Sequence, residues 1–131
     1  MIGLDTIVLV RFFARDHIVE TRLADRVMGS LSADSPGWLS LPVLMELVWV
    51  MSHTYRVSRE GIVSILGQLA SRDQIVIEQA DIVRTTLGLF GGGKAGFADC
   101  LIAASARAAG CSRTRTFDKI AARDAGMQLI T

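Results

Sequence analysis

The stretch Met1-Ile2-Gly3-Leu4-Asp5-Thr6-Ile7-Val8-Leu9-Val10-Arg11 opens the chain. A short apolar run ends at Asp5, and a second apolar run follows Thr6. This pattern predicts a strand, a tight turn and then the start of a helix. In an open α/β sheet, ligands bind at the carboxyl ends of the strands. Asp5 is therefore a candidate site residue. The alternative is that Asp5 or Thr6 caps the helix by accepting a backbone N–H.

Composition places limits on the class of protein. The chain has 131 residues, which predicts a single domain spanning 1–131. A mean hydropathy of +0.40 is apolar for a soluble monomer, so we expect an apolar interface to a partner or to a second copy. No uncharged run approaches the about 20 residues that span a bilayer, and the start does not resemble a signal peptide. Cys100 and Cys111 lack metal-site spacing, which favours reduced, semi-buried thiols in a cytoplasmic protein.

Strand-like and helix-like segments alternate along the whole chain. Helix-like patterns lie at about 17–31, 42–55, from Ser58 onward, and at about 81–90, 97–109 and 119–125. The first of these is expected to have Asp16 as its N-cap and a buried stripe of Val19, Leu23, Val27 and Leu31. Alternation of this kind predicts an α/β fold with a parallel sheet covered on both faces. The predicted strands lie at about 1–4, 38–41, 74–78, 113–117 and 127–130.

Three more acids, like Asp5, are candidate site residues. Glu46 is the only charged residue of a helix that is apolar nearly all round, and an unpaired buried carboxylate is costly. We therefore expect Glu46 to pair with a cation, to hold a proton or to face a cleft. Asp99 lies in the first turn of the helix at 97–109, where the helix dipole alone would favour it. Asp118 directly follows a predicted strand, and it is also a plausible N-cap.

The four acids are expected to converge. Strand ends and the helix starts that follow them share one rim of a parallel sheet, although the convergence is an inference from topology. Four like charges in one place repel by several kcal/mol, so such a cluster must bind cations or hold protons. Oxygen ligands without His or Cys suit Mg²⁺ or Mn²⁺, which can activate water and stabilise the leaving oxygen of a phosphodiester. With these acids set aside, 14 basic residues face 9 acidic ones, which is consistent with a polyanionic substrate.

A P-loop is not supported by the sequence. Gly88, Gly93 and Lys94 have P-loop spacing, but the next residue is Ala95, which has no hydroxyl for Mg²⁺. The segment also follows a helical pattern, whereas a P-loop follows a strand. We therefore expect a flexible turn at 91–96, with Lys94 near a substrate. Arg11 is a second candidate for a phosphate contact.

The ordered set of motifs resembles the PIN-domain ribonucleases, specifically the VapC toxins of bacterial toxin–antitoxin pairs. The resemblance is carried by four segments and covers essentially the whole chain. They are Gly3 to Phe13 (Gly-Leu-Asp-Thr-Ile-Val-Leu-Val-Arg-Phe-Phe), Leu44-Met45-Glu46-Leu47, Phe97-Ala98-Asp99-Cys100-Leu101-Ile102-Ala103 and Thr114-Arg115-Thr116-Phe117-Asp118-Lys119.

This resemblance implies a three-layer α/β/α sandwich around a parallel sheet of about five strands, and an Mg²⁺- or Mn²⁺-dependent endoribonuclease. It places the acidic catalytic and metal site on Asp5, Glu46, Asp99 and Asp118, with Thr6 and Thr116 as hydrogen-bonding groups behind the metal. Asp5, Asp99 and Asp118 would hold a divalent ion, and Glu46 would ligate it through water or orient the attacking water. The implied partners are an RNA substrate (tRNA is one candidate), a VapB-like antitoxin that blocks the site, and a second copy in a homodimer.

The chain departs from the family pattern at two positions. Ile7 stands where the family commonly has Asn, and Gly96 stands where an acid often precedes the Phe of the third motif. The departures favour, weakly, a rival interpretation as a non-catalytic PIN-like binding module, whereas the four retained acids favour the enzyme. A haloacid dehalogenase-type phosphatase would need an acid at position 7. A receiver domain would need Lys at the late strand end, where Asp118 stands.

Overall fold

The computed structural model describes all 131 residues, which fall into two compact units. The N-terminal unit comprises 1–78 and the C-terminal unit comprises 79–131. We describe each unit by itself. None of the helices combines the length and the apolar character that crossing a bilayer requires.

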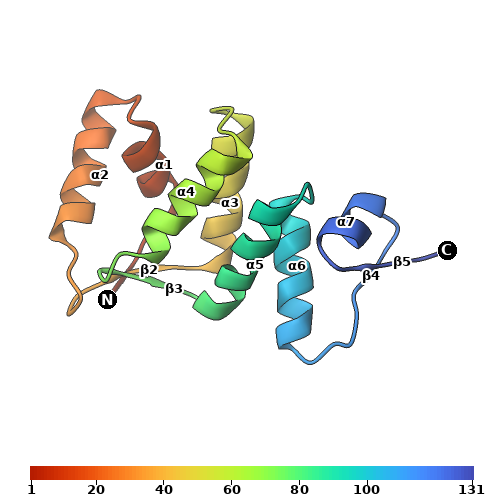
Figure 1. The fold of residues 1–131 in the computed structure, drawn as a ribbon. Coiled ribbons are helices and arrows are strands. Elements are labelled where there is room, and N and C mark those ends of the chain that lie inside the picture. The colour runs from red at the N-terminus through yellow and green to blue at the C-terminus, as the bar shows by residue number, and fades with distance from the viewer. The chain divides into compact units, whose positions relative to one another are not determined.

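The N-terminal unit is built on a parallel sheet with the strand order β1-β2-β3 (Figure 1). Ile2 pairs with Gly37, and Gly37 pairs with Ile75. Four helices connect the strands, and α1 packs against both α2 and α3. The elements are β1 Ile2–Gly3, α1 Thr6–Ala14, α2 Ile18–Ser30, β2 Gly37–Leu39, α3 Leu41–His53, α4 Arg59–Ala70 and β3 Ile75–Ile77.

Branched aliphatic side chains form the core of this unit, because α1, α3 and α4 each bury an apolar stripe. A Cβ atom at position 37 would lie 2.8 Å from Cδ1 of Leu4, so any larger residue there would have to displace the Leu4 side chain. The most deeply buried side chains are those of Leu9, Val10, Leu39, Leu44, Leu47, Ile62, Leu66 and Leu69.

The C-terminal unit pairs two helices and adds a small second sheet. α5 packs against α6, and the rings of Phe90 and Phe97 meet edge to face with centroids 5.7 Å apart (Figure 1). α7 lies against two parallel strands, β4 and β5, in which Arg115 pairs with Gln128. The elements are α5 Ala80–Gly92, α6 Phe97–Ala108, β4 Arg115–Thr116, α7 Lys119–Asp124 and β5 Gln128–Leu129.

The predicted α/β class with parallel strands is confirmed. All five strands lie within about two residues of their predicted positions, but they pair as one three-stranded and one two-stranded sheet. A single sheet of about five strands is therefore not shown. The three-layer sandwich and the single domain over 1–131 stay predictions.

Two details of α2 differ from the sequence prediction. Its N-cap is His17, whose Nδ1 accepts a hydrogen bond from the backbone N–H of Glu20, and not Asp16. The predicted buried stripe is also wrong, because Val19 and Leu23 are 62% and 48% exposed. Four-residue spacing fixes which side chains share a face but not which face packs inward. The side chains buried in α2 are Thr21, Ala24 and Met28.

The prediction that α3 is buried nearly all round is also wrong. Glu46 is exposed and Trp49 is 59% exposed, while the buried side chains are Leu44, Leu47, Val48 and Met51. The helix begins at Leu41 after the Ser40 N-cap, so Pro42 lies within its first turn, where a missing N–H costs nothing.

Two smaller predictions concern the glycine-rich segment and the thiols. α5 continues to Gly92, so the predicted turn is shorter than 91–96 and the P-loop is excluded. Both cysteines are free, but they are not semi-buried as the sequence suggested, because Cys100 is buried and Cys111 is exposed.

Candidate active site

Asp5 lies where β1 gives way to α1. The backbone N–H of Leu4 still donates to the carbonyl of Trp38, at 3.0 Å, and the chain then turns. Asp5 is the N-cap of α1, and its Oδ1 accepts a hydrogen bond from the N–H of Thr6 at 2.8 Å. The side chain is exposed. The capping alternative is therefore correct, and it leaves Oδ2 available for another ligand.

Thr6 joins this strand end to α3. Its side chain is 5% exposed, and its hydroxyl donates a hydrogen bond to Oε1 of Glu46. The contact is possible because α1 packs directly against α3. Asp5 and Glu46 are far apart in the sequence, yet each accepts a hydrogen bond from Thr6. Glu46 is exposed with Oε2 uncommitted, so the carboxylate is not buried as the sequence suggested, and the predicted cleft stays a prediction.

Asp99 is the third residue of α6 and is half-buried. The N-cap of this helix is Gly96, which has no side chain to cap it. A Cβ atom at Gly96 would lie 3.9 Å from Oδ2 of Asp99. The Asp99 carboxylate accepts no hydrogen bond, so both of its oxygens remain available.

Asp118 caps α7. Its Oδ1 accepts hydrogen bonds from the N–H groups of Ile120 and Ala121 at 2.8 and 2.9 Å. Its own N–H donates to Oγ1 of Thr116 at 3.0 Å, which holds the capping residue against the end of β4. Asp118 therefore has the same two features as Asp5, a strand before it and one oxygen engaged in capping.

The donor chemistry of these residues fits a divalent cation. Asp5 and Glu46 belong to the N-terminal unit, and Asp99 and Asp118 belong to the C-terminal unit. Each keeps at least one uncommitted carboxylate oxygen, the ligand type that Mg²⁺ and Mn²⁺ prefer. Within either unit, no three side chains of the ligating types gather closely enough to hold a metal. The meeting of all four acids at one ion stays a prediction.

Arg11, one of the two predicted phosphate contacts, is engaged in the structure. Its Nε donates to Oε1 of Glu20 at 2.7 Å, and a second nitrogen lies 3.8 Å from Asp16. The hydrogen bond from Arg11 lowers the pKa of the Glu20 carboxyl. A phosphate would therefore have to share the Arg11 guanidinium with Glu20.

Lys94, the other predicted contact, lies in the loop between α5 and α6. Its backbone N–H donates to Oδ2 of Asp124 at 2.8 Å. The guanidinium of Arg123 and this N–H lower the pKa of Asp124 from 3.8 to about 2. The loop that carries Lys94 is thus tied to α7, the helix that Asp118 begins.

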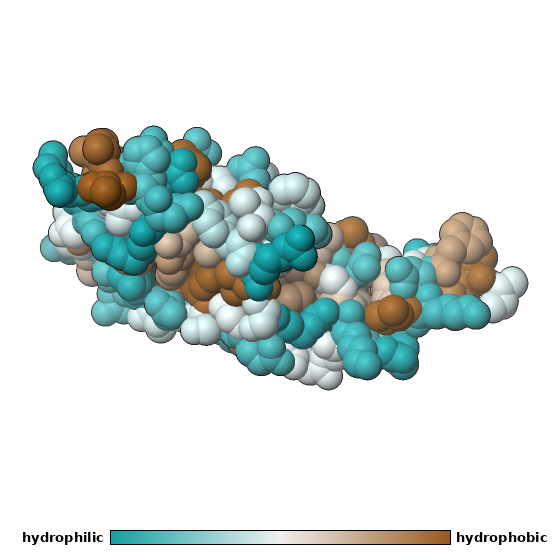
Figure 2. Space-filling model, turned by 90° about the horizontal axis from the view of Figure 1, so that it is seen from above, coloured by the Kyte–Doolittle hydropathy of each residue, from teal (hydrophilic) through white to brown (hydrophobic).

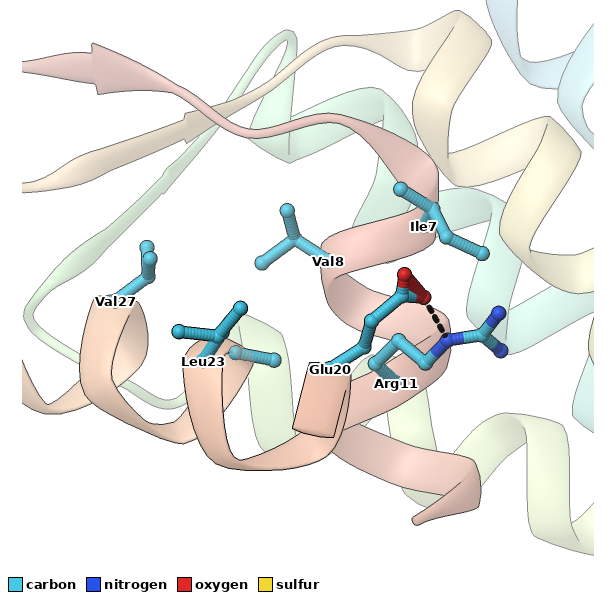
Figure 3. A pocket seen from close by; sticks show the side chains of 7 residues that line it. Ile7, Val8, Arg11, Glu20, Leu23 and Val27 are labelled. Atoms are coloured by element: carbon cyan, nitrogen blue, oxygen red, sulfur yellow. Dashed lines mark hydrogen bonds and ion pairs between the residues drawn. The ribbon is translucent and has the colours of Figure 1, made fainter. Parts of the chain in front are cut away.

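A hollow of about 190 Å³ lies between α1 and α2 (Figure 3). Ile7 and Val8 face it from α1, and Leu23 and Val27 face it from α2, while the Arg11–Glu20 ion pair closes one side. Sequence analysis missed this feature. The available signal was the stripe at four-residue spacing, of which Leu23 and Val27 line the hollow. Ile7, a departure from the family pattern, is 46% exposed here.

His53 lies two turns after Glu46 on α3. Its ring stacks on that of Trp49, with centroids 4.7 Å apart and an interplanar angle of 17°. Its Nδ1 lies 2.9 Å from the carbonyl oxygen of Trp49. His53 is therefore engaged with its own helix.

An α/β protein with carboxylates at the ends of parallel strands belongs to the broad class whose ligands bind at that edge. A protein-family comparison makes this specific: residues 2–126 match the PIN domain. The chain belongs to the PIN-domain family. PIN domains are generally nuclease modules, typically metal-dependent ones that hydrolyse phosphodiester bonds. A search of curated proteins finds no match for this chain.

Proposed function

We propose that this protein is a VapC-type endoribonuclease toxin that uses Mg²⁺ or Mn²⁺ at Asp5, Glu46, Asp99 and Asp118. The observation that carries the proposal is the contact of Thr6 with both Asp5 and Glu46. Asp5 and Glu46 come from distant parts of the chain, yet both accept a hydrogen bond from Thr6 at the end of β1. A purely structural role for each carboxylate would not require them to be held by the same residue. A divalent ion offsets the repulsion between such carboxylates.

Each residue has a role that follows from its surroundings. Asp5, Asp99 and Asp118 would hold the ion, which supplies an activated water and stabilisation of the leaving oxygen. Thr6 fixes the rotamer of Glu46 by its hydrogen bond, so that Oε2 can orient a water. Thr116 positions the backbone of Asp118 in the same way. Attack by water on the phosphate would leave 5′-phosphate and 3′-hydroxyl ends.

Exposed apolar side chains support the proposed protein partners, a VapB-like antitoxin and a second copy. Val19 and Leu23 are exposed one turn apart on α2, and Leu23 lines the hollow with Ile7. Exposed large hydrophobic groups gathered in this way are typical of interaction surfaces. Sedimentation of the purified chain over a range of concentrations tests the homodimer, and a monomer at all concentrations would contradict it.

The decisive experiment is cleavage of total tRNA by the purified protein with Mg²⁺ or Mn²⁺, with EDTA, and with the variant Asp5→Asn. Asn caps a helix about as well as Asp, so the variant should fold while losing a carboxylate. Asp34→Asn removes the same charge from an exposed turn and is the matched control. We expect cleavage that EDTA and Asp5→Asn abolish and Asp34→Asn preserves.

Other results would point elsewhere. Cleavage by Asp5→Asn at the parent rate would contradict the assigned site. No cleavage of any RNA by folded protein free of antitoxin, together with no divalent-ion binding by calorimetry, would favour the alternative of a non-catalytic PIN-like binding module. Ion binding without cleavage of tRNA would direct the search to other RNA substrates.

A further inference from the structure

The two units carry opposite net charges. The N-terminal unit has seven basic and nine acidic residues, whereas the C-terminal unit has seven basic and four acidic ones, a net charge of +3. Within the C-terminal unit, Arg84 pairs with Asp81 and Arg123 pairs with Asp124. Four other basic residues of this unit have no acidic partner, namely Arg107, Arg113, Arg115 and Lys119. The excess positive charge is therefore concentrated around β4.

Two of these side chains, Arg113 and Arg115, lie along one extended segment, and Lys119 follows it as the first residue of α7. Arg113 and Arg115 are exposed, while Thr114 and Thr116 between them are half-buried. The carbonyls of both threonines accept hydrogen bonds from the β5 segment, at 2.8 and 2.7 Å. Arg115 lies in β4, and Arg113 and Phe117, two residues before and after it, are exposed like Arg115. In extended backbone, residues two apart such as Arg113 and Arg115 are separated by about 6.7 Å, twice the rise per residue.

Phe117 directly follows β4 and is 79% exposed. Its ring makes no aromatic contact in the structure, so one of the largest side chains of the unit contributes little to any core. It lies between Arg115 and Lys119 and directly precedes Asp118. Figure 2 shows apolar groups, in brown, among hydrophilic ones, in teal, over the part of the C-terminal unit that carries β4, β5 and α7.

A small polar hollow lies at the start of the segment. It has a volume of about 30 Å³ and is lined by Arg107, Ser112, Arg113 and Thr114, among others. This volume suffices for one water-sized group. Two guanidinium groups and two hydroxyls around such a space suit an anionic oxygen of a phosphate.

We propose that Arg113, Arg115, Phe117 and Lys119, here called the β4 strip, bind single-stranded RNA. The three cations contact successive phosphates, and Phe117 stacks under a base, beside the nucleotide presented to Asp118. Cations interleaved with an exposed aromatic ring are the feature of sequence-tolerant single-strand binding. Duplex RNA would engage the cations but would offer no free base face to Phe117. The inference rests on the proposed nuclease function and names how its substrate is held.

The test measures RNA binding by fluorescence anisotropy in an Asp5→Asn background, so that the RNA stays intact. The probe is a fluorescein-labelled single-stranded RNA of mixed sequence, 12 nucleotides long, with its duplex for comparison. Phe117→Ala should weaken single-strand binding about 5- to 150-fold, the range for loss of one base stack. Phe117→Trp should preserve it. Ile102→Ala, which also removes an exposed apolar group, is the matched control and should have no effect.

The cations have their own test in the same assay. Replacing Arg113 and Arg115 with Gln should weaken binding and make the slope of log K against log salt less negative by about 1.4. Arg22 and Arg26 are exposed on α2, and the corresponding pair of Gln substitutions there is the control. Independently, bound RNA should slow the reaction of a thiol reagent with Cys111, the exposed thiol that lines the polar hollow.

The possible failures can be distinguished. If the parent protein binds no RNA and the wild type cleaves none, both the proposed function and the strip are overturned. If RNA is cleaved and bound but Phe117→Ala and the double Gln variant behave like the parent, only the strip is overturned. If polyglutamate binds with the same dependence on Phe117, the surface belongs to an acidic protein partner and the RNA assignment is wrong.

Discussion

The hydroxyl of Thr6 donates a hydrogen bond to Oε1 of Glu46, a residue 40 positions further along the chain. The backbone N–H of the same threonine donates to Oδ1 of Asp5. One buried residue therefore holds two exposed carboxylates, one at the end of β1 and one on α3. This arrangement can be tested without knowing the substrate.

Thr6→Val should lower the free energy of unfolding by about 1 kcal/mol, because it removes one hydrogen bond at nearly constant volume while the exposed Glu46 can be rehydrated. RNA cleavage should fall more than stability does, because Glu46 loses its fixed rotamer. Thr6→Ser should restore both. Urea unfolding and cleavage rates provide the measurements. Thr85→Val, at an exposed helical threonine, is the control, and equal effects at the two sites would contradict the argument.

Asp118 allows capping to be separated from catalysis. Asp118→Asn keeps an oxygen for the N–H groups of Ile120 and Ala121, so its stability should stay within a few tenths of a kcal/mol of the wild type. Asp118→Ala should lose about 0.5–2 kcal/mol, because the cap is removed. Both variants should lose cleavage. Thermal unfolding measures the capping role of Asp118, and a cleavage assay on the same variants measures its catalytic role. RNA cleavage by Asp118→Asn would show that Asp118 is not part of the active site.

Gly96→Asp tests one departure from the family pattern. The backbone at position 96 has φ −64° and ψ 156°, which any residue can adopt, and an Asp there would cap α6. Its Cβ would lie 3.9 Å from Oδ2 of Asp99, which creates a pair of carboxylates. Calorimetry should detect tighter Mn²⁺ binding than in the wild type. Unchanged or weaker binding would show that Asp99 is not a metal ligand.

Gly93→Ala should destabilise the protein by about 1–3 kcal/mol, the usual cost of overpacking. The added Cβ would meet Cβ and Cγ of Asp124 at 2.9 and 3.0 Å and would disturb the hydrogen bond from Lys94. Gly92→Ala is a close control, because its Cβ would meet nothing and the position is helical. Chemical unfolding of both variants should show loss of stability only at position 93.

The Asp124 carboxyl should make stability depend on pH in the acid range. Its pKa is about 2 in the folded protein against an ordinary value of 3.8, so its ionised form favours folding. The contribution is complete above about pH 4 and disappears as the pH falls to about 2. Asp124→Asn should therefore be less stable than the wild type at pH 7, and the difference should vanish near pH 2. A stability difference between Asp124→Asn and the wild type that persists at pH 2 would show that the Asp124 charge is not its cause.

The sequence was sufficient to place the strands, because each is an apolar run bounded by polar residues or glycine. It also identified the capping roles of Asp5 and Asp118 as alternatives to a site role, and both caps are present. The family of the chain could likewise be inferred, because four acids follow one another in a characteristic order. Periodicity and local chemistry determine all of these features.

The errors came from questions of tertiary packing. The α2 stripe was predicted to be buried, but its members Leu23 and Val27 line a hollow, because the core takes the neighbouring face with Thr21 and Met28. Glu46 was expected to be buried, yet it lies at the surface and meets a threonine in place of a cation. Arg11 was assigned to phosphate, and only the fold shows that Glu20 already binds it. No spacing rule reveals such partners.

The helix caps at Asp5 and Asp118 have an evolutionary consequence. A descendant that abandoned RNA cleavage would still need an oxygen at both positions, so Asn, Ser or Thr should replace Asp there more readily than apolar residues. Asp99, whose carboxylate has no partner, carries no such constraint and should drift freely. The residue types at these three positions would therefore mark inactive lineages without any assay.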